Sequence, residues 1–336
     1  MRLMICLAAI SIFFSCNNSE KTPDVSNIQV NLKTIRFEKE LFALDTNQIS
    51  SQLGPLIEKT PSFGQNFLYT ILNADPQWGA DTTTQYLKGF MRSYKSVYDS
   101  AELLFSDFTT YEKDIKLSLQ YLKYYFPSYK LPETIITYIG PLDGYGDIIS
   151  DDAIIVGLQH HLGKDFTLYN SIGVRETYPE YITNRFEPDY ISINCIKNIV
   201  SDMYPEKSED ATLVVRMVEQ GKRLYLLSKL LPHFEENKII GYTSKQLKEC
   251  YDHEASIWNL FVQNNLLQNP DNNIIKNYIG DSPKTQELGD ASPGNIGAFA
   301  GWQIVKKFMK KSSKISLNKL MLMDAEAILT EAKYKP

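Results

Sequence analysis

The spacing of apolar residues changes along the chain and predicts strands in some segments and helices in others. Residues 28–37 alternate apolar with polar side chains, and this period of two predicts a strand. Aromatic and leucine residues then recur every three or four positions in 86–105 and in 111–126, as they do on one face of a helix. Pro127 and Pro132 are expected to end the second of these helices.

A second strand-forming region lies near the middle of the sequence, and helical spacing follows it. The apolar, β-branched runs 134–139 and 153–158 flank a loop rich in glycine and aspartate, which predicts a hairpin or two adjacent strands. From residue 178 onward we expect helices at 178–186, 189–203, 210–231, 244–267, 293–311 and 316–332. Thr243 has the capping-box pattern of a hydroxyl followed three positions later by an amide, and Ser292 stands before Pro293 as a cap.

These elements predict an α+β fold that is predominantly α-helical and has a small sheet. No internal repeat or low-complexity linker interrupts residues 28–336, so we expect one globular domain there. A chain of 336 residues that is 43% apolar and 22% charged is long and apolar enough for a large core. Because 35 basic residues face 40 acidic ones, the net charge of −5 gives no general reason to bind nucleic acid.

The first sixteen residues have the order of an export signal. Arg2 precedes an apolar run of 12 residues, whereas a membrane-spanning helix needs about 20. A small residue then precedes Cys16, as in the lipobox of bacterial lipoproteins, where the cysteine thiol is acylated. We expect residues 1–15 to be a lipoprotein signal peptide, Cys16 to carry lipid, and residues 16–27 to be a flexible tether. A plain signal peptide with an incidental cysteine is the alternative.

Two cysteines remain in the body of the chain, Cys195 and Cys250. An exported protein could pair them, but both lie among apolar residues at helical spacing. Buried free thiols are therefore the favoured interpretation.

The chain has few histidines that could serve in acid–base or metal chemistry, namely His160, His161, His233 and His253. A zinc-hydrolase helix needs H-E-x-x-H, and His253 with Glu254 begins this pattern without a second histidine following. His160 and His161 are adjacent and so point in different directions. No nucleophile elbow, phosphate-binding loop or dinucleotide fingerprint occurs. The sequence therefore predicts neither a metal site nor a cofactor.

Acidic residues offer weaker candidates. The loop 143–152 lacks the alternate acids and the distal glutamate of a calcium loop, and a solvated turn is expected. On a continuous helix over 244–267, Glu254 falls inside an apolar stripe that includes Tyr251 and Trp258. A carboxylate in that stripe must be paired or protonated, so we expect a structural ion pair or cap, with a catalytic acid as the alternative.

The helix 210–231 has a core stripe in which Gly221 permits close approach of another helix. Glu219 and Lys222 lie beside or opposite that stripe, and we expect both at solvent or at the rim of a groove.

A glycine-rich helix start, 292–303, is the least generic stretch of the sequence. Glycines inside a helix cost about 1 kcal/mol each, which favours tight backbone packing there, with a bound ligand as the alternative. Trp302 ends the stretch and is a candidate stacking surface. Five lysines gather in 306–314, where they complement the helix dipole and could also face an anionic membrane.

Several short blocks occur in a consistent order along the chain. They include I-R-F-E-K-E-L-F (35–42), G-L-Q-H-H-L-G-K-D (157–165), M-V-E-Q-G-K-R-L-Y (217–225), H-E-A-S-I-W (253–258) and S-P-G-N-I-G-A-F-A-G-W-Q-I-V (292–305). In these blocks the sequence resembles the GldB-type gliding-motility lipoproteins of Bacteroidota. The resemblance implies a lipid-anchored cell-envelope protein that faces the periplasm and supports gliding and the associated type IX secretion machinery. Its partners would be the membrane and other motility or secretion proteins of the envelope.

Three hypotheses about function follow. The leading one is a non-catalytic, lipid-anchored component of a motility or secretion assembly. The helical layout is also distantly similar to zinc-dependent proteases of the zincin class, so the second is a divergent hydrolase with a site near His160, His161, Glu219 or Glu254. The third is a ligand-binding lipoprotein that uses its tyrosines and Trp302 as stacking surfaces.

Overall fold

The computed structural model describes residues 22–206 and 211–336. The expected signal peptide 1–15, the expected lipidation site Cys16 and residues 17–21 of the expected tether lie outside the described residues.

The packed part of the chain begins earlier than residue 28. Val25 is only 3% exposed and belongs to the core. The side-chain amide of Gln120, on helix α6 (Thr109–Tyr125), donates a hydrogen bond of 2.8 Å to the main-chain oxygen of Ile28. The segment expected to be a tether is therefore attached to the body over its last residues.

A small mixed sheet forms the middle of the molecule. Its strands are β1 (Lys33–Arg36), β2 (Thr134–Tyr138), β3 (Ile148–Ile149) and β4 (Ala153–Gly157), in the order β1-β2-β4-β3. β1 pairs with β2 and β2 with β4 in parallel, and β3 runs antiparallel to β4. The runs 134–139 and 153–158 are therefore adjacent strands and not a hairpin, because β3 in the loop between them forms the antiparallel pair. The strand expected over 28–37 is confined to β1.

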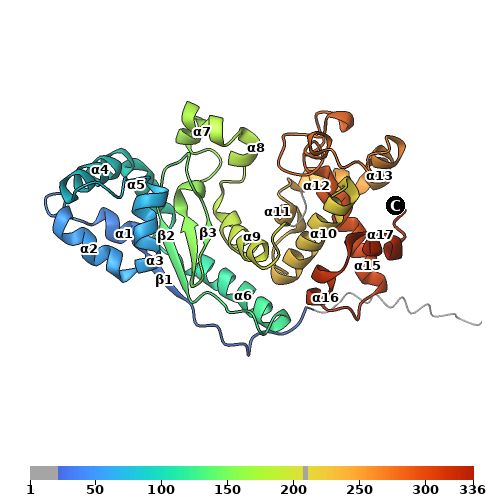
Figure 1. The fold of residues 1–336 in the computed structure, drawn as a ribbon, viewed down its shortest axis with the longest axis horizontal. Helices are drawn as coiled ribbons and strands as arrows, with labels where there is room; N and C mark the ends of the chain where they lie inside the picture. The colour runs from blue at the N-terminus through green and yellow to red at the C-terminus, as the bar shows by residue number, and fades with distance from the viewer. Residues whose placement is uncertain (1–21, 207–210) are drawn as a thin grey trace, which may run out of the picture.

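Helices make up most of the chain and lie in two groups on either side of the sheet (Figure 1). The N-terminal group contains α1 (Phe37–Phe42), α2 (Ile49–Lys59), α3 (Pro61–Asn66), α4 (Ala80–Ser93) and α5 (Lys95–Leu104). Near the sheet lie α6, α7 (Ile172–Thr177), α8 (Glu180–Thr183) and α9 (Ile191–Met203). The C-terminal group contains α10 (Leu213–Leu230), α11 (Glu236–Ile240), α12 (Ser244–Asp252), α13 (Glu254–Gln263), α14 (Asn272–Ile275), α15 (Ile296–Lys311), α16 (Leu317–Leu322) and α17 (Ala325–Ala332). The predicted α+β class, mostly helical with a small sheet, is confirmed.

Several expected helices are interrupted or shifted. The helix expected over 86–105 is broken at Tyr94 into α4 and α5, and the one over 244–267 is broken at His253 into α12 and α13. The helix expected over 293–311 begins only at Ile296, after Asn295 in the left-handed conformation (φ 54°). Ser292 does not cap it, because its Oγ accepts from the main-chain N–H of Thr285 at 3.1 Å and its one proton is shared between the main-chain oxygens of Gly289 and Thr285. The capping box at Thr243 is confirmed.

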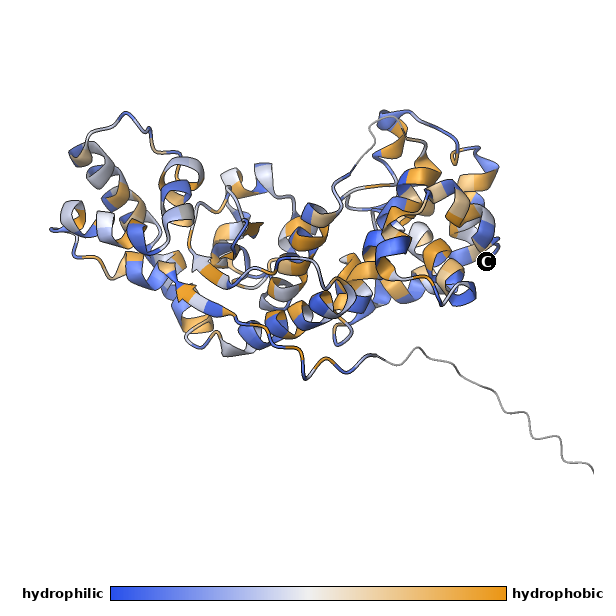
Figure 2. Cartoon of the chain, turned by 60° about the horizontal axis from the view of Figure 1, so that its bottom comes forward, coloured by the Kyte–Doolittle hydropathy of each residue, from blue (hydrophilic) through white to orange (hydrophobic). Residues whose placement is uncertain are grey.

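Helices α10 and α15 approach each other closely at two glycines. A Cβ atom built on Gly221 would lie 2.2 Å from the main-chain oxygen of Gly301, and one built on Gly301 would lie 1.7 Å from that of Met217. Because only glycine fits at both positions, the prediction that Gly221 permits close helix packing is confirmed. Helices in both groups carry apolar residues on one side and polar residues on the other (Figure 2).

Candidate functional site

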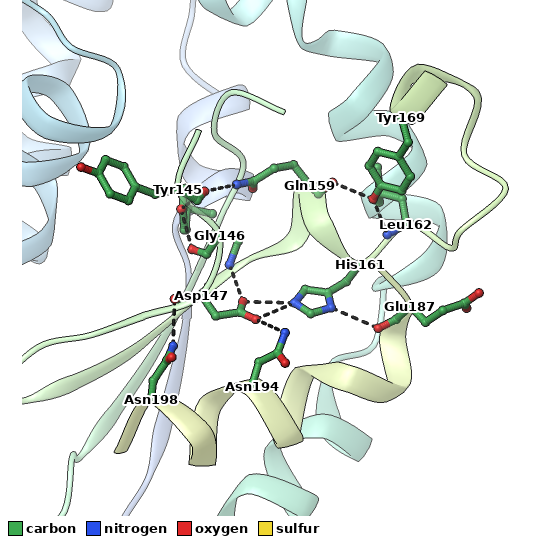
Figure 3. Close-up of polar contacts among 12 residues, drawn as sticks. Tyr145, Gly146, Asp147, Gln159, His161, Leu162, Tyr169, Glu187, Asn194 and Asn198 are labelled. Carbon is green, nitrogen blue, oxygen red and sulfur yellow. Dashed lines mark hydrogen bonds and ion pairs between the residues drawn. The ribbon is translucent and has the colours of Figure 1, made fainter. Parts of the chain in front are cut away.

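A buried aspartate–histidine pair lies between the sheet and the first turns of α9 (Figure 3). Nε2 of His161 lies 2.9 Å from Oδ2 of Asp147, and Nδ1 lies 3.1 Å from the main-chain oxygen of Glu187. The side-chain amide of Asn194 donates to Oδ2 of Asp147 at 3.0 Å, and the main-chain N–H of Gly157 donates to Oδ1 at 3.1 Å. The pair thus fastens the end of β4, the loop before β3 and α9 to one another.

The partners of the pair determine where its protons are. A main-chain oxygen can only accept, so Nδ1 of His161 carries a proton, and the ionised carboxylate of Asp147 requires a second proton on Nε2. Burial lowers the pKa of His161, but the charge and hydrogen bonds of Asp147 outweigh burial and raise it. Burial likewise raises the pKa of Asp147, but His161 and Asn194 bring it below its ordinary value. The result is a buried ion pair whose polar atoms all have internal partners.

His160 has separate partners, as the adjacent positions of the two histidines predict. Its ring stacks on Phe186 with centroids 4.4 Å apart, and its Nε2–H donates to the main-chain oxygen of Leu142 at 2.9 Å. Burial lowers the pKa of His160 to about 4, so the ring is neutral at physiological pH. A Cβ on Gly146 would lie 2.6 Å from Nδ1 of His160, which shows how closely the backbone covers this ring.

The expectation of a solvated turn over 143–152 is wrong for Asp147, whose side chain is 5% exposed. Sequence reasoning missed this residue and its partners Asn194 and Asn198 on α9. The side-chain amide of Asn198 donates to the main-chain oxygen of Asp147 at 2.8 Å. The available signal was two asparagines one helical turn apart among apolar residues, since buried amides need partners.

Glu219 lies at the rim of a surface pocket, as expected. The pocket has a volume of about 350 Å³ and is lined by apolar side chains such as Met203, Ile279 and Met321, together with the charged residues Glu219 and Arg223. The Glu219 side chain is 35% exposed, and its Oε1 lies 2.6 Å from the ammonium group of Lys222.

Lys222 is buried, which corrects the expectation of a solvent or rim position for it. Its ammonium group donates to the main-chain oxygens of Met321 at 3.1 Å and Met323 at 2.9 Å, at the end of α16. The long aliphatic stem passes through the core while the charge reaches these oxygens and Glu219, which explains how a lysine is tolerated there.

Glu254 is half-buried in the first turn of α13, on the same side of the helix as the buried Ile257 and Phe261, so its expected place on an apolar stripe is confirmed. Tyr251, which the same stripe was expected to include, lies on α12 before the break at His253 and is 36% exposed. The partner of Glu254 is a hydroxyl: Tyr334 donates to its Oε1 at 2.6 Å. The carboxylate is therefore paired internally, as expected, although with a tyrosine near the C-terminus and not with a charged group.

Trp302 is fully buried, so the expectation that it offers a stacking surface is wrong. The ammonium group of Lys306 lies 3.9 Å from the centroid of its ring and 2.6 Å from Oε1 of Glu236. The glycines before it pack against backbone: a Cβ on Gly294 would lie 2.1 Å from the main-chain oxygen of Ser282. The favoured interpretation of this stretch as tight packing is confirmed.

The candidates singled out by sequence do not converge on one site. His160 and His161 lie beside the sheet, whereas Glu219, Glu254 and Trp302 lie on separate helices of the C-terminal group. Within residues 22–206 and 211–336, no three His, Cys, Asp or Glu residues are grouped so that they could hold a metal ion. Cys195 and Cys250 are both buried free thiols, as expected.

Among the comparisons with known proteins, the match to a family model identifies the family of this chain. No curated protein and no solved structure matches the chain, so the likeness to zincins stays a prediction. None of the helices in the described part of the chain is both long enough and apolar enough to span a bilayer. The family model described as gliding motility protein GldB matches residues 18–336, and the chain therefore belongs to this family of gliding-motility lipoproteins.

Proposed function

We propose that this protein is a non-catalytic component of the cell envelope that is held at a membrane by lipid on Cys16. Its domain faces the periplasm, where it supports gliding motility and the type IX secretion machinery through contacts with other envelope proteins. Membership of the GldB family supports the motility role and the membrane anchor.

One observation above all supports the proposal that the protein is non-catalytic. The histidines and acids that are candidates for catalysis form hydrogen bonds, ring contacts or ion pairs within the protein. Both ring nitrogens of His161 are occupied, and the ring of His160 is stacked and hydrogen-bonded. Glu219 is paired with Lys222, and Glu254 accepts from Tyr334. A general acid or base must reach a substrate proton, and these groups are directed at the protein itself.

A ligand-binding role is the second candidate, and the pocket beside Glu219 favours it. The pocket combines an apolar lining with a few charged groups, as small-molecule sites do. Glu206 and Glu219 are the acids that line it in the described part of the chain, and Glu219 is also a candidate from the sequence, so this residue separates the two hypotheses.

The test is a Glu219→Gln variant expressed in cells that lack the native protein. The amide keeps the shape of the side chain but removes the negative charge beside the ammonium group of Lys222, whose side chain is 2% exposed, so we expect a loss of about 1–3 kcal/mol in stability. Glu102→Gln is a control for the loss of a half-exposed carboxylate, because Glu102 also pairs with a lysine at 3.0 Å, but that lysine, Lys39, is 33% exposed and the cost in stability should be smaller. We expect both variants to restore gliding and secretion to the level of the unmodified protein.

Loss of gliding in the Glu219→Gln strain alone, at normal protein abundance in the envelope, would contradict the scaffold role and favour a ligand or catalytic site. Stoichiometric zinc in the purified full-length protein would also contradict the scaffold role and would favour a zinc-dependent hydrolase. Crosslinking in intact cells, followed by identification of the attached proteins, tests the proposed envelope partners directly.

A further inference from the structure

The end of α15 and the segment after it form the most basic part of the chain. Between Asp290 and Asp324 the sequence has six lysines and no acidic residue. The lysines are Lys306, Lys307, Lys310, Lys311, Lys314 and Lys319.

Half of these lysines have partners within the protein. Lys306 pairs with Glu236, Lys307 donates to the main-chain oxygen of Lys335 at 3.4 Å, and Lys311 donates to that of Ala332 at 2.6 Å. Their positions are explained by packing and by the negative end of the α15 dipole.

The other three, Lys310, Lys314 and Lys319, form what we call the lysine surface. All three are exposed, and none of their ammonium groups has a hydrogen bond or ion pair with any residue of the described ranges. The dipole of α15 accounts for Lys310 alone, because Lys314 lies beyond that helix and Lys319 lies in α16.

The described chain begins beside this surface. Thr22 and Pro23 line an open groove of about 720 Å³ together with Ser313, Ile315 and other residues that connect α15 to α16. In Figure 1 the N-terminal segment runs from β1 beneath α6 to this end of the C-terminal helices. Tyr124, half exposed, lines the same groove, and tyrosine is a side chain favoured at membrane interfaces.

Cys16 precedes Thr22 by six residues, a length of chain that spans at most about 20 Å. We propose that the lysine surface faces the membrane that holds the lipid anchor and binds its anionic headgroups, so that the domain stands on the end of α15. This inference rests on the proposed lipid anchor, which brings the groove and its lysines to the bilayer.

The rest of the molecule favours the same orientation. The chain as a whole carries a net charge of −5, so an anionic membrane repels most of the domain and attracts the one lysine-rich end. Each lysine near an anionic surface contributes about fivefold to binding, so three lysines favour this orientation by roughly 100-fold at low ionic strength. Added salt screens the attraction.

The test is the orientation of the acylated full-length protein on vesicles. Vesicles of phosphatidylethanolamine with phosphatidylglycerol are compared with vesicles of phosphatidylcholine alone. A nitroxide is attached to Ser313→Cys, in the lysine surface, or to the exposed control position Ser96→Cys on α5. On the anionic vesicles we expect a water-soluble relaxation agent to reach the label at 313 much less than on the neutral ones, and to reach the label at 96 equally on both.

Charge reversal provides the matched comparison. The Lys310→Glu, Lys314→Glu and Lys319→Glu triple variant should lose the protection at 313, as should high salt. A triple reversal at the exposed Lys164, Lys245 and Lys276, which changes the net charge by the same amount, should keep it.

Equal access to the label at 313 on both kinds of vesicle, in protein that co-sediments with both, would overturn the orientation and leave the anchor intact. Protein that is not acylated and sediments with neither would instead contradict the proposed anchor.

Discussion

At the scale of single residues, two adjacent histidines are both buried, but one ring is positively charged and the other is neutral. His161 is held as an imidazolium by Asp147, whereas His160 is held neutral by burial. The reason is the partner of each ring, a carboxylate in one case and a main-chain oxygen with a stacked phenyl ring in the other. Nothing in the pair of letters H-H distinguishes them, because the carboxylate comes from a loop 14 residues away.

His160 should make the fold less stable in acid. Its folded pKa of about 4 lies below the ordinary value of 6.5, so the unfolded chain takes up a proton first as the pH falls. The stability it contributes is complete above pH 6.5 and declines toward pH 4, by about 2–3 kcal/mol. His161 contributes in the opposite sense, since its pKa is raised and its contribution is lost as the pH rises through that raised pKa.

Urea unfolding at pH 7.5 and pH 4.5 tests this. We expect His160→Phe to lose less stability on acidification than the unmodified protein, after a pH-independent cost of about 1 kcal/mol for the lost hydrogen bond to Leu142. A His253→Gln variant, changed at an exposed histidine, serves as the control. Equal acid sensitivity of the unmodified protein and His160→Phe would show that His160 is not the responsible group.

At the scale of elements, the contact between α10 and α15 is set by glycine. A methyl group on Gly301 would lie 1.7 Å from the main-chain oxygen of Met217, so Gly301→Ala must push the two helices apart. We expect a loss of about 3 kcal/mol or more in the free energy of unfolding. Gly89→Ala is the control: this glycine lies inside α4 with nothing within 4 Å of the added atom, and alanine there should stabilise by about 0.5–1 kcal/mol. Similar unfolding midpoints for the two variants would contradict the close-packed contact.

Elements were predictable where their periodicity is local. α6, α9 and α10 follow from apolar spacing, and Gly221 follows from its place in a core stripe. The break at His253 has no proline or glycine to predict it, so one continuous helix was expected over 244–267, and the 36% exposure of Tyr251 was not foreseen. Lys222 was misplaced for a related reason, since its partners are main-chain oxygens about 100 residues away that no periodicity reveals.

At the scale of the whole molecule, two forces act at the membrane and they differ in size. A lipid chain contributes about 0.8 kcal/mol for each buried methylene, whereas each lysine of the surface contributes about 1 kcal/mol. Two acyl chains therefore outweigh Lys310, Lys314 and Lys319 several times over. The lipid therefore determines whether the protein binds the membrane, and the lysines determine only the orientation of the domain on it.

This difference in membrane-binding energy between the lipid and the lysines predicts the effect of removing the anchor in cells. Cys16→Ala should move the protein from the membrane fraction to the soluble fraction even though the lysine surface is intact, and the fold should persist because Val25 is the first buried residue of the described chain. Cell fractionation with acyl labelling measures this, and Cys6→Ala, a change within the expected signal peptide, should remain acylated and sedimentable. Membrane retention of Cys16→Ala with its acyl label still present would place the anchor at another residue. Retention without label would mean that contacts other than the lipid, such as protein partners, hold it at the membrane more tightly than the three lysines can.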